Sequence, residues 1–323
     1  MSNFLDPAIL FFVFGVVAGV LKSNLEIPQP ISRFLSLYLL MALGLKGGFA
    51  LAHSGIHEEV LTSIAVAIIL ALGVPFAGYA FLRTKISRYD AAAIAATYGS
   101  VSAVTFITAT AYLDSVGLAY GGHMAAAMAF MESPAIIIAV VIASFVRKQN
   151  EKGKSTEGAH GVGAVLKHAL TDGAQIVLIG ALLVGVISGE AGKAAMAPFS
   201  VDLFKGMLAF FLLDMGLLTA RNFPPLKSLS PWLIAYAILG PVSHAAIALL
   251  LSMLTGLETG NTALLMVLAA SASYIAVPAA LRFAIPEANP SLYFGLSLGV
   301  TFPINILIGI PIYTEIAKRV MAG

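Results

Sequence analysis

The chain has 323 residues, of which 59% are hydrophobic and only 11% are charged, and its mean hydropathy is +0.94. Soluble domains average about 25% charged residues, so this composition predicts a membrane protein. The 18 Lys and Arg against 16 Asp and Glu leave a net charge of +2, which argues against a nucleic-acid binder. The chain contains no Cys, which excludes disulfides, thiolate metal sites and cysteine nucleophiles.

Apolar stretches of about 20 residues, the length that crosses a bilayer, recur ten times along the chain. The first five cover residues 7–21, 31–52, 58–82, 90–112 and 120–146, and the second five cover 173–188, 199–220, 231–254, 261–283 and 291–320. The chain start lacks the basic region and the cleavage site of a signal peptide, so the first stretch is interpreted as a membrane span. We expect an all-α membrane protein with a first five-helix repeat at 1–146, a linker at 147–172 and a second repeat at 173–323.

The basic residues indicate the orientation, because cytoplasmic loops are enriched in Lys and Arg. With ten spans, three basic residues fall on one side: Lys193, Lys318 and Arg319. Thirteen fall on the other side: Lys22, Arg33, Arg83, Lys85, Arg88, Arg147, Lys148, Lys152, Lys154, Lys167, Arg221, Lys227 and Arg282. This asymmetry predicts a cytoplasmic linker and both termini outside.

The two halves resemble each other, as in transporters built from internal repeats. Residues 98–103 (YGSVSA) match 269–274 (AASASY) at an offset of 171 residues, and 131–134 (MESP) aligns with 300–303 (VTFP). An odd number of spans per repeat makes the second copy enter the membrane from the opposite face. The sequence therefore predicts inverted repeats.

Small and hydroxyl residues in the middle of the fourth and ninth spans predict that both helices are broken there. A break in a membrane helix exposes amides with partial positive charge at the start of its second half. In inverted repeats two such starts meet near the midplane and, without a Lys or Arg, suit a small monoanion. The expected substrate-binding residues are Gly99, Ser100, Val101, Ser102, Ser271, Ala272 and Ser273. The alternative is that these small residues only let helices pack closely.

An acidic residue within a membrane span is usually functional. Glu132 lies mid-span beside Pro134 and, with oxygens of Thr105, Thr301 or Asn305, is a candidate ligand for sodium. A proton carrier or a neutral structural carboxyl remains an alternative.

Lys46 and Asp214 each lie about fifteen residues into a span, and each is a candidate for the substrate path. Their spans run in opposite directions, which predicts a depth difference of roughly 12 Å and no ion pair between them. Lys46 is expected to extend outward or to interact with a helix C-terminus. The spacings Gly15-x-x-x-Gly19 and Gly44-x-x-x-Gly48 predict close helix contacts within or between subunits.

Four runs of sequence resemble the sodium-dependent bicarbonate transporter family of cyanobacteria and other bacteria: residues 98–106, 270–279, 284–291 and 298–305. The resemblance covers nearly the whole chain. It implies sodium-coupled bicarbonate uptake across the bacterial cytoplasmic (inner) membrane, a ten-span fold with core and gate domains, and a homotrimer. It also implies a PII-like regulator on the cytoplasmic side.

Carried over residue by residue, the family's substrate region falls on 99–102 and 271–273, and its acidic residue before Pro, often Asp, falls on Glu132. We expect a secondary active transporter that binds Na⁺ and bicarbonate where spans four and nine cross, with Na⁺ as the coupling ion. Symport of another small monoanion such as a short carboxylate, sodium/proton exchange and a passive channel are the alternatives. An enzyme is not expected, since the chain has no Gly-x-Ser-x-Gly or paired catalytic Asp motif.

Overall fold

The computed structural model describes residues 6–55, 57–150, 173–226 and 229–321. Most of the predicted linker, residues 151–172, lies outside the described residues. The described part is all helical, and its first half contains α1 (Pro7–Val20), α2 (Gln29–Ser54), α3 (Glu58–Leu82), α4 (Arg88–Gly99), α5 (Ala103–Ser115) and α6 (Met124–Asn150).

The second half contains more and shorter elements, several of them π-helical turns. They are α8 (Gly173–Ala197), η2 (Pro198–Asp202), α9 (Phe204–Arg221), α10 (Phe223–Leu226), α11 (Pro231–Thr255), α12 (Thr259–Ala270), α13 (Ala276–Ala284), α14 (Pro290–Leu296), η3 (Ser297–Thr301), α15 (Phe302–Ile304), η4 (Asn305–Gly309) and α16 (Ile310–Met321).

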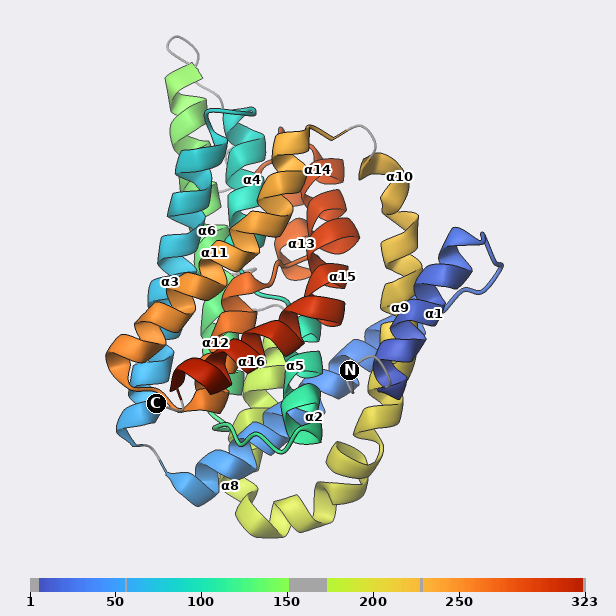
Figure 1. Cartoon of the computed structure of the whole chain (residues 1–323), viewed down its shortest axis with the longest axis vertical. Coiled ribbons are helices and arrows are strands. Elements are labelled where there is room, and N and C mark those ends of the chain that lie inside the picture. Colours follow the sequence, from blue (N-terminus) through green and yellow to red (C-terminus); the bar gives the residue numbers. More distant parts are fainter. Residues whose placement is uncertain (1–5, 56, 151–172, 227–228, 322–323) are drawn as a thin grey trace.

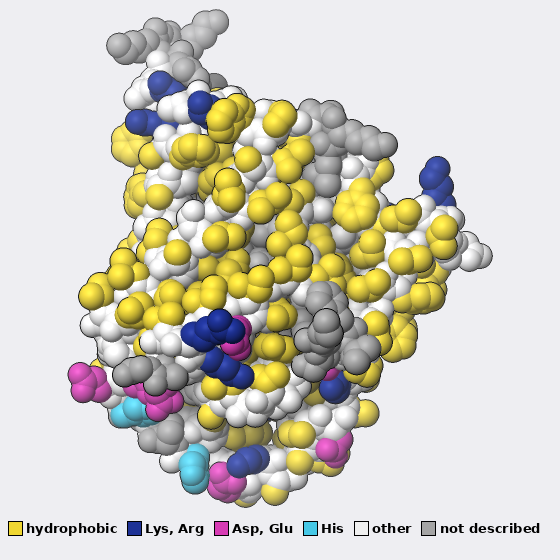
Figure 2. Space-filling model, viewed as in Figure 1, with side chains coloured by type: hydrophobic (Ala, Val, Ile, Leu, Met, Phe, Trp, Pro, Cys, Tyr) yellow, Lys and Arg dark blue, Asp and Glu magenta, His cyan; other side chains and the backbone are white. Residues whose placement is uncertain are grey.

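Seven described segments are long and apolar enough to cross a membrane, which agrees with a multi-pass membrane protein. They are Gln29–His53, Glu58–Leu82, Arg88–Ser115, Met124–Arg147, Gly173–Arg221, Pro231–Thr255 and Pro290–Met321. Two shorter apolar helices, Pro7–Val20 and Thr259–Ala270, accompany them. Figure 2 shows hydrophobic side chains over much of one face, with Lys and Arg at its upper left end.

Three features of the helices refine the predicted spans. The span predicted to end at 188 ends at a kink, because Gly189 takes a non-helical conformation with a positive φ of 54°, and a second helical stretch continues to Ala197. The span predicted to start at 120 begins at Met124, after a loop. The segment 291–320 is helical throughout but contains the π-helical turns η3 and η4.

The helices form two units in space (Figure 1). In the four-helix unit, α1 packs along α9 and α2 along α8. The larger unit contains α3 to α6 and α11 to α16, and in Figure 1 the four-helix unit lies along its lower and right sides. Contacts of α2 with α5 and α6, and of α9 with η3, join the two units.

Glycines bring the paired helices of the four-helix unit into backbone contact. A Cβ added to Gly15 would overlap the carbonyl oxygen of Leu213, and one added to Gly48 would overlap the carbonyl oxygen of Leu182. The glycine spacings that begin at Gly15 and Gly44 therefore serve contacts within the chain. Such close approach lets van der Waals contact hold membrane helices together.

Candidate functional site

The first interruption separates α4 from α5. Helix α4 ends at Gly99, where a Cβ would lie 2.6 Å from the Pro75 ring, so only glycine fits there. Ser102 caps α5, because its Oγ accepts a hydrogen bond from the Thr105 N–H at 3.2 Å. A serine cap of this kind starts a new helix after a short extended segment. The interruption lies at the serines that the sequence indicated.

The second interruption separates α12 from α13. Helix α12 ends at Ala270, and the chain runs through residues 271–275 before α13 begins at Ala276. The Val277 N–H donates to Ser273 Oγ at 3.3 Å. The two helices before the breaks are enclosed by protein, with residues 91–99 and 260–270 all buried. Burial within protein is the setting in which irregular backbone is tolerated at membrane depth.

Hydrogen bonds donated by backbone N–H groups join the two interruptions directly. The Ser102 N–H donates to Ser271 Oγ at 2.9 Å, and the Ser273 N–H donates to the Thr97 carbonyl at 2.8 Å. Ser102 and Ser273 are the positions that the predicted repeat alignment makes equivalent. The two breaks are therefore held against each other as one structural element.

A cavity of about 1,020 Å³ reaches this element. On the larger unit its lining includes residues 101–104 and 273–276, so the starts of α5 and α13 both face the same space. The partial positive charges of two helix N-termini are therefore directed at one cavity. The opposite wall comes from α2 and α9 of the four-helix unit, including Ser32, Ser36, Phe211, Met215 and Leu218.

The cavity extends to one end of the molecule. Its lining includes Gln29 at the start of α2, Gly173 at the start of α8, Asn222 at the end of α9 and Pro290 at the start of α14. These helix ends lie on the side that the basic residues predict to be cytoplasmic. The cavity therefore runs from the paired interruptions toward that side.

The predicted substrate-binding residues separate into two groups. All seven are buried, but Val101, Ser102 and Ser273 line the cavity, whereas Gly99, Ser100, Ser271 and Ala272 do not. Ser100 Oγ donates to the Glu132 carbonyl at 2.9 Å, and Ser271 Oγ donates to the Leu268 carbonyl at 2.8 Å. These two serines satisfy backbone groups and fix the shape of the breaks.

The predicted sodium ligands also separate: one lines the cavity, and the other three make hydrogen bonds within the protein. Glu132 lines the cavity. Thr105 Oγ1 donates to Ser102 Oγ at 3.0 Å, Thr301 Oγ1 donates to the Ala237 carbonyl at 2.7 Å, and Asn305 Nδ2 donates to the Ala270 carbonyl at 2.7 Å. Asn305 thus donates a hydrogen bond to a carbonyl at the C-terminal end of α12, where the helix itself provides no N–H partner. In the described ranges no three Asp, Glu or His side chains gather into a metal-binding group.

Lys46 and Asp214 do not pair, as the depth argument predicted. Lys46 Nζ instead lies 2.8 Å from Asp114 Oδ2, near the C-terminal end of α5. Asp214 is buried within α9 of the four-helix unit.

The site predicted from the sequence did not include the wall that α2 and α9 contribute. Phe211, Met215, Leu218 and Asn222 recur at intervals of four, three and four residues, which places them on one face of α9. That spacing was a usable signal, but such stripes are common in membrane helices. Tyr274, whose hydroxyl donates to Met215 Sδ at 3.6 Å, was also missed and links the second interruption to this wall.

Comparison with known proteins agrees with this geometry. A family model for the Na⁺-dependent bicarbonate transporter superfamily matches residues 7–318. A search of curated proteins gave no match. The matched segment includes both interruptions, Glu132 and every described wall of the cavity. The chain therefore belongs to the Na⁺-dependent bicarbonate transporter superfamily and is a transporter rather than an enzyme.

Proposed function

We propose that this protein is a secondary active transporter that couples Na⁺ entry to bicarbonate uptake into the cytoplasm. The observation that carries the proposal is the single cavity lined by the starts of both α5 and α13. Ser102 and Ser273 supply hydroxyl groups there, and neither interruption contains Lys or Arg. Partial charges without a full cation favour a small monoanion over a multiply charged one.

The proposed topology has ten crossings in two inverted repeats, with 1–146 and 173–323 as the repeats. The segment Gly173–Arg221 is 49 residues long, more than twice the length that one crossing needs, and Gly189 and η2 interrupt it. Counting it twice and adding the two shorter apolar helices to the seven long segments gives ten crossings. The excess of Lys and Arg supports a cytoplasmic linker and both termini outside a bacterial inner membrane.

The proposed sodium site includes Glu132, with Thr105, Thr301 and Asn305 as further oxygen donors near the interruptions. Glu132 brings the negative charge that a hard cation prefers into the same cavity as the two helix starts. At a 1:1 ratio the net charge moved is zero, so a tenfold sodium gradient supports about tenfold accumulation, or about 1.4 kcal/mol. Greater accumulation requires more sodium ions per anion.

The proposed transport cycle moves the larger unit, as the core domain, against the four-helix unit, as the gate. The cavity lies between the units, and glycine contacts hold the α1–α9 and α2–α8 pairs together within the gate. Cavity access from the linker end corresponds to a state open to the cytoplasm. Alternation requires a second state in which this end closes and the opposite end opens.

Uptake of labelled bicarbonate by proteoliposomes with an inward sodium gradient tests the proposal. We expect accumulation that stops when choline replaces sodium. Sodium-independent flux would indicate a channel, and stronger competition by a short carboxylate would indicate that monoanion as substrate. Sodium-driven proton movement without bicarbonate would indicate an exchanger. No bicarbonate uptake by protein that transports another solute would overturn the proposal.

The resemblance also leads us to propose a homotrimer and a PII-like partner on the linker side. The mass of the protein in detergent or nanodiscs tests the first, with about three times the 33.6 kDa of one chain expected. Binding of a purified PII-like protein to the full chain, compared with a chain whose linker is replaced by a neutral sequence, tests the second.

A further inference from the structure

Asp214 lies beside the cavity face of α9. At about 100° per residue, Asp214 is about 40° from Leu218 and about 60° from Phe211 around the helix. Both neighbours line the cavity, as does Ser32 on the adjacent helix α2. Asp214 therefore occupies the strip of α9 between the cavity and α2.

The carboxyl of Asp214 is poorly satisfied for a charged group. The residue is only 5% exposed, and no hydrogen-bond donor in the described part of the chain reaches its Oδ2. The Ser32 hydroxyl is the hydrogen-bonding group that approaches the carboxyl. A buried carboxylate with an open oxygen is unfavourable by several kcal/mol, whereas the neutral acid has much less to lose.

The charged groups around Asp214 do not compensate its charge. Helix α1, which packs on the other side of α9, has no charged residue. Arg221 acts on Asp214 from seven residues along α9, about 10 Å away. Arg33 is exposed at the cavity mouth, while Tyr274 and Glu132 face the cavity from the larger unit.

Asp214 is also close enough to the second interruption to matter for an anion. Tyr274, which lines the cavity next to Ser273, donates its hydroxyl to Sδ of Met215 at 3.6 Å, and Met215 directly follows Asp214 in α9. A negative Asp214 would repel a monoanion held at the helix starts, and a neutral Asp214 would not. Proton binding at Asp214 must then raise the affinity of the cavity for the anion, and anion binding must raise the affinity of Asp214 for the proton by the same factor, because linkage is reciprocal.

We propose that Asp214 is a proton-binding site of the four-helix unit that is occupied when the anion is bound in the cavity. The inference rests on the proposed anion site, and it adds a second cation, H⁺, to the ligands of the protein. Protonation turns the carboxylate into an acid that can donate through the oxygen now lacking a partner. A lower pH therefore tightens anion binding, and Asp214→Asn imitates the protonated side chain.

Infrared spectroscopy of the purified protein tests the proton itself, without any anion. We expect a protonated-carboxyl band that persists above the pH at which exposed carboxyls ionise, is lost in Asp214→Asn and is kept in Asp202→Asn, a control on an exposed carboxyl of η2. In Ser32→Ala the band should persist to higher pH, because that variant lacks the hydroxyl that donates a hydrogen bond to the ionised Asp214 carboxylate. An Asp214→Asn spectrum identical to the wild type at every pH would overturn the proposal.

Anion binding at a fixed bicarbonate-ion concentration tests the coupling. Across the pH range in which the Asp214 band disappears, we expect the wild-type association constant to fall with rising pH, by at most about tenfold per pH unit for one linked proton. Asp214→Asn should bind equally tightly across that range, and Asp202→Asn should follow the wild type. Equal pH dependence in the wild type and Asp214→Asn would overturn the coupling. A wild type that shows the band but binds no bicarbonate would instead contradict the proposed function.

Discussion

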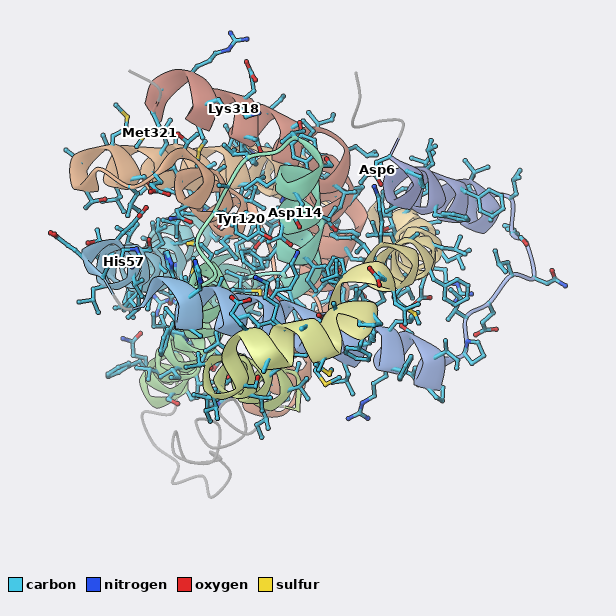
Figure 3. All side chains as sticks on the ribbon, turned by 90° about the horizontal axis from the view of Figure 1, so that it is seen from below. Asp6, His57, Asp114, Tyr120, Lys318 and Met321 are labelled. Carbon is cyan, nitrogen blue, oxygen red and sulfur yellow. The ribbon has the colours of Figure 1, made fainter. Side chains whose placement is uncertain are left out.

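Lys46 Nζ lies 2.8 Å from Asp114 Oδ2, and this ion pair joins α2 of the four-helix unit to α5 of the larger unit. Figure 3 shows Asp114 and Tyr120 in the middle of the lower end of the molecule, opposite the end that the cavity reaches. The side chains of Lys46 and Asp114 are 32% and 47% exposed, so the pair contributes little to the stability of the fold. It is a contact between the two units outside the lining of the cavity.

Charge reversal at this pair should change access to the cavity more than stability. Because the chain has no Cys, a single Ser36→Cys on the cavity wall can report access. We expect a membrane-impermeant thiol reagent to label this cysteine from the linker side only, and from both sides after Asp114→Lys. Restored one-sided labelling in the Lys46→Asp, Asp114→Lys double variant would identify the pair as the cause. Unchanged labelling in Asp114→Lys would rule out this role.

Replacing the cavity serines should weaken substrate binding. Ser102→Ala or Ser273→Ala removes a hydroxyl at a helix start, and one lost hydrogen bond of about 0.5–1.5 kcal/mol corresponds to roughly 2- to 10-fold weaker bicarbonate binding. Calorimetry on the purified protein measures the effect. Ser297→Ala is the matched control, since that buried serine donates to the Tyr293 carbonyl away from the cavity. Equal affinity in all three variants would remove Ser102 and Ser273 from the site.

Neutralising the cavity carboxyl should affect sodium coupling. Glu132→Gln keeps the size of the side chain but removes its negative charge, so we expect sodium dependence of bicarbonate uptake to be lost. Uptake at a series of external sodium concentrations measures this. Glu190→Gln changes an exposed carboxyl and should retain the wild-type response. A Glu132→Gln variant with unchanged sodium dependence would place the sodium site elsewhere.

Close helix packing in the four-helix unit should be sensitive to one methyl group. A Cβ at Gly216 would overlap the carbonyl oxygen of Phe12, so Gly216→Ala should lower the free energy of unfolding by about 1–3 kcal/mol. Gly206→Ala on the same helix meets nothing within 4 Å and should be neutral or slightly stabilising. Thermal unfolding in detergent compares the two. Equal unfolding temperatures for both variants would contradict the close contact.

The ion pair between Arg147 and Glu287 should make stability depend on pH. Arg147 Nε and Nη2 donate to the two carboxylate oxygens of Glu287 at 2.6 and 2.7 Å, and these bonds lower the pKa of Glu287 from its ordinary 4.5. The stabilisation is therefore complete above about pH 4.5 and is lost as the pH falls through the lower pKa of the folded protein. The difference in unfolding temperature between wild type and Glu287→Gln should shrink below pH 4.5. A constant difference across that range would contradict this assignment.

The sequence by itself determined the class of the protein and the location of its breaks. Composition and apolar length identified a multi-pass membrane protein, because the bilayer dictates both. Gly99, Ser102, Ser271 and Ser273 marked the interruptions, because Gly and Ser commonly end and cap helices and the two motifs recur at matching positions of the two halves. The lack of pairing between Lys46 and Asp214 followed from their depths alone.

Only the tertiary structure decided which side chains face the cavity. Ser100 and Ser102 look equivalent in sequence, but Ser100 donates to the Glu132 carbonyl and does not line the cavity, whereas Ser102 does. Lys46 meets Asp114, 68 residues away in the chain, only after α2 packs beside α5. The wall from α2 and α9 and the position of Asp214 also depend on how the two units meet. Local preferences set where helices start and stop, and contacts between distant segments set what each polar atom meets.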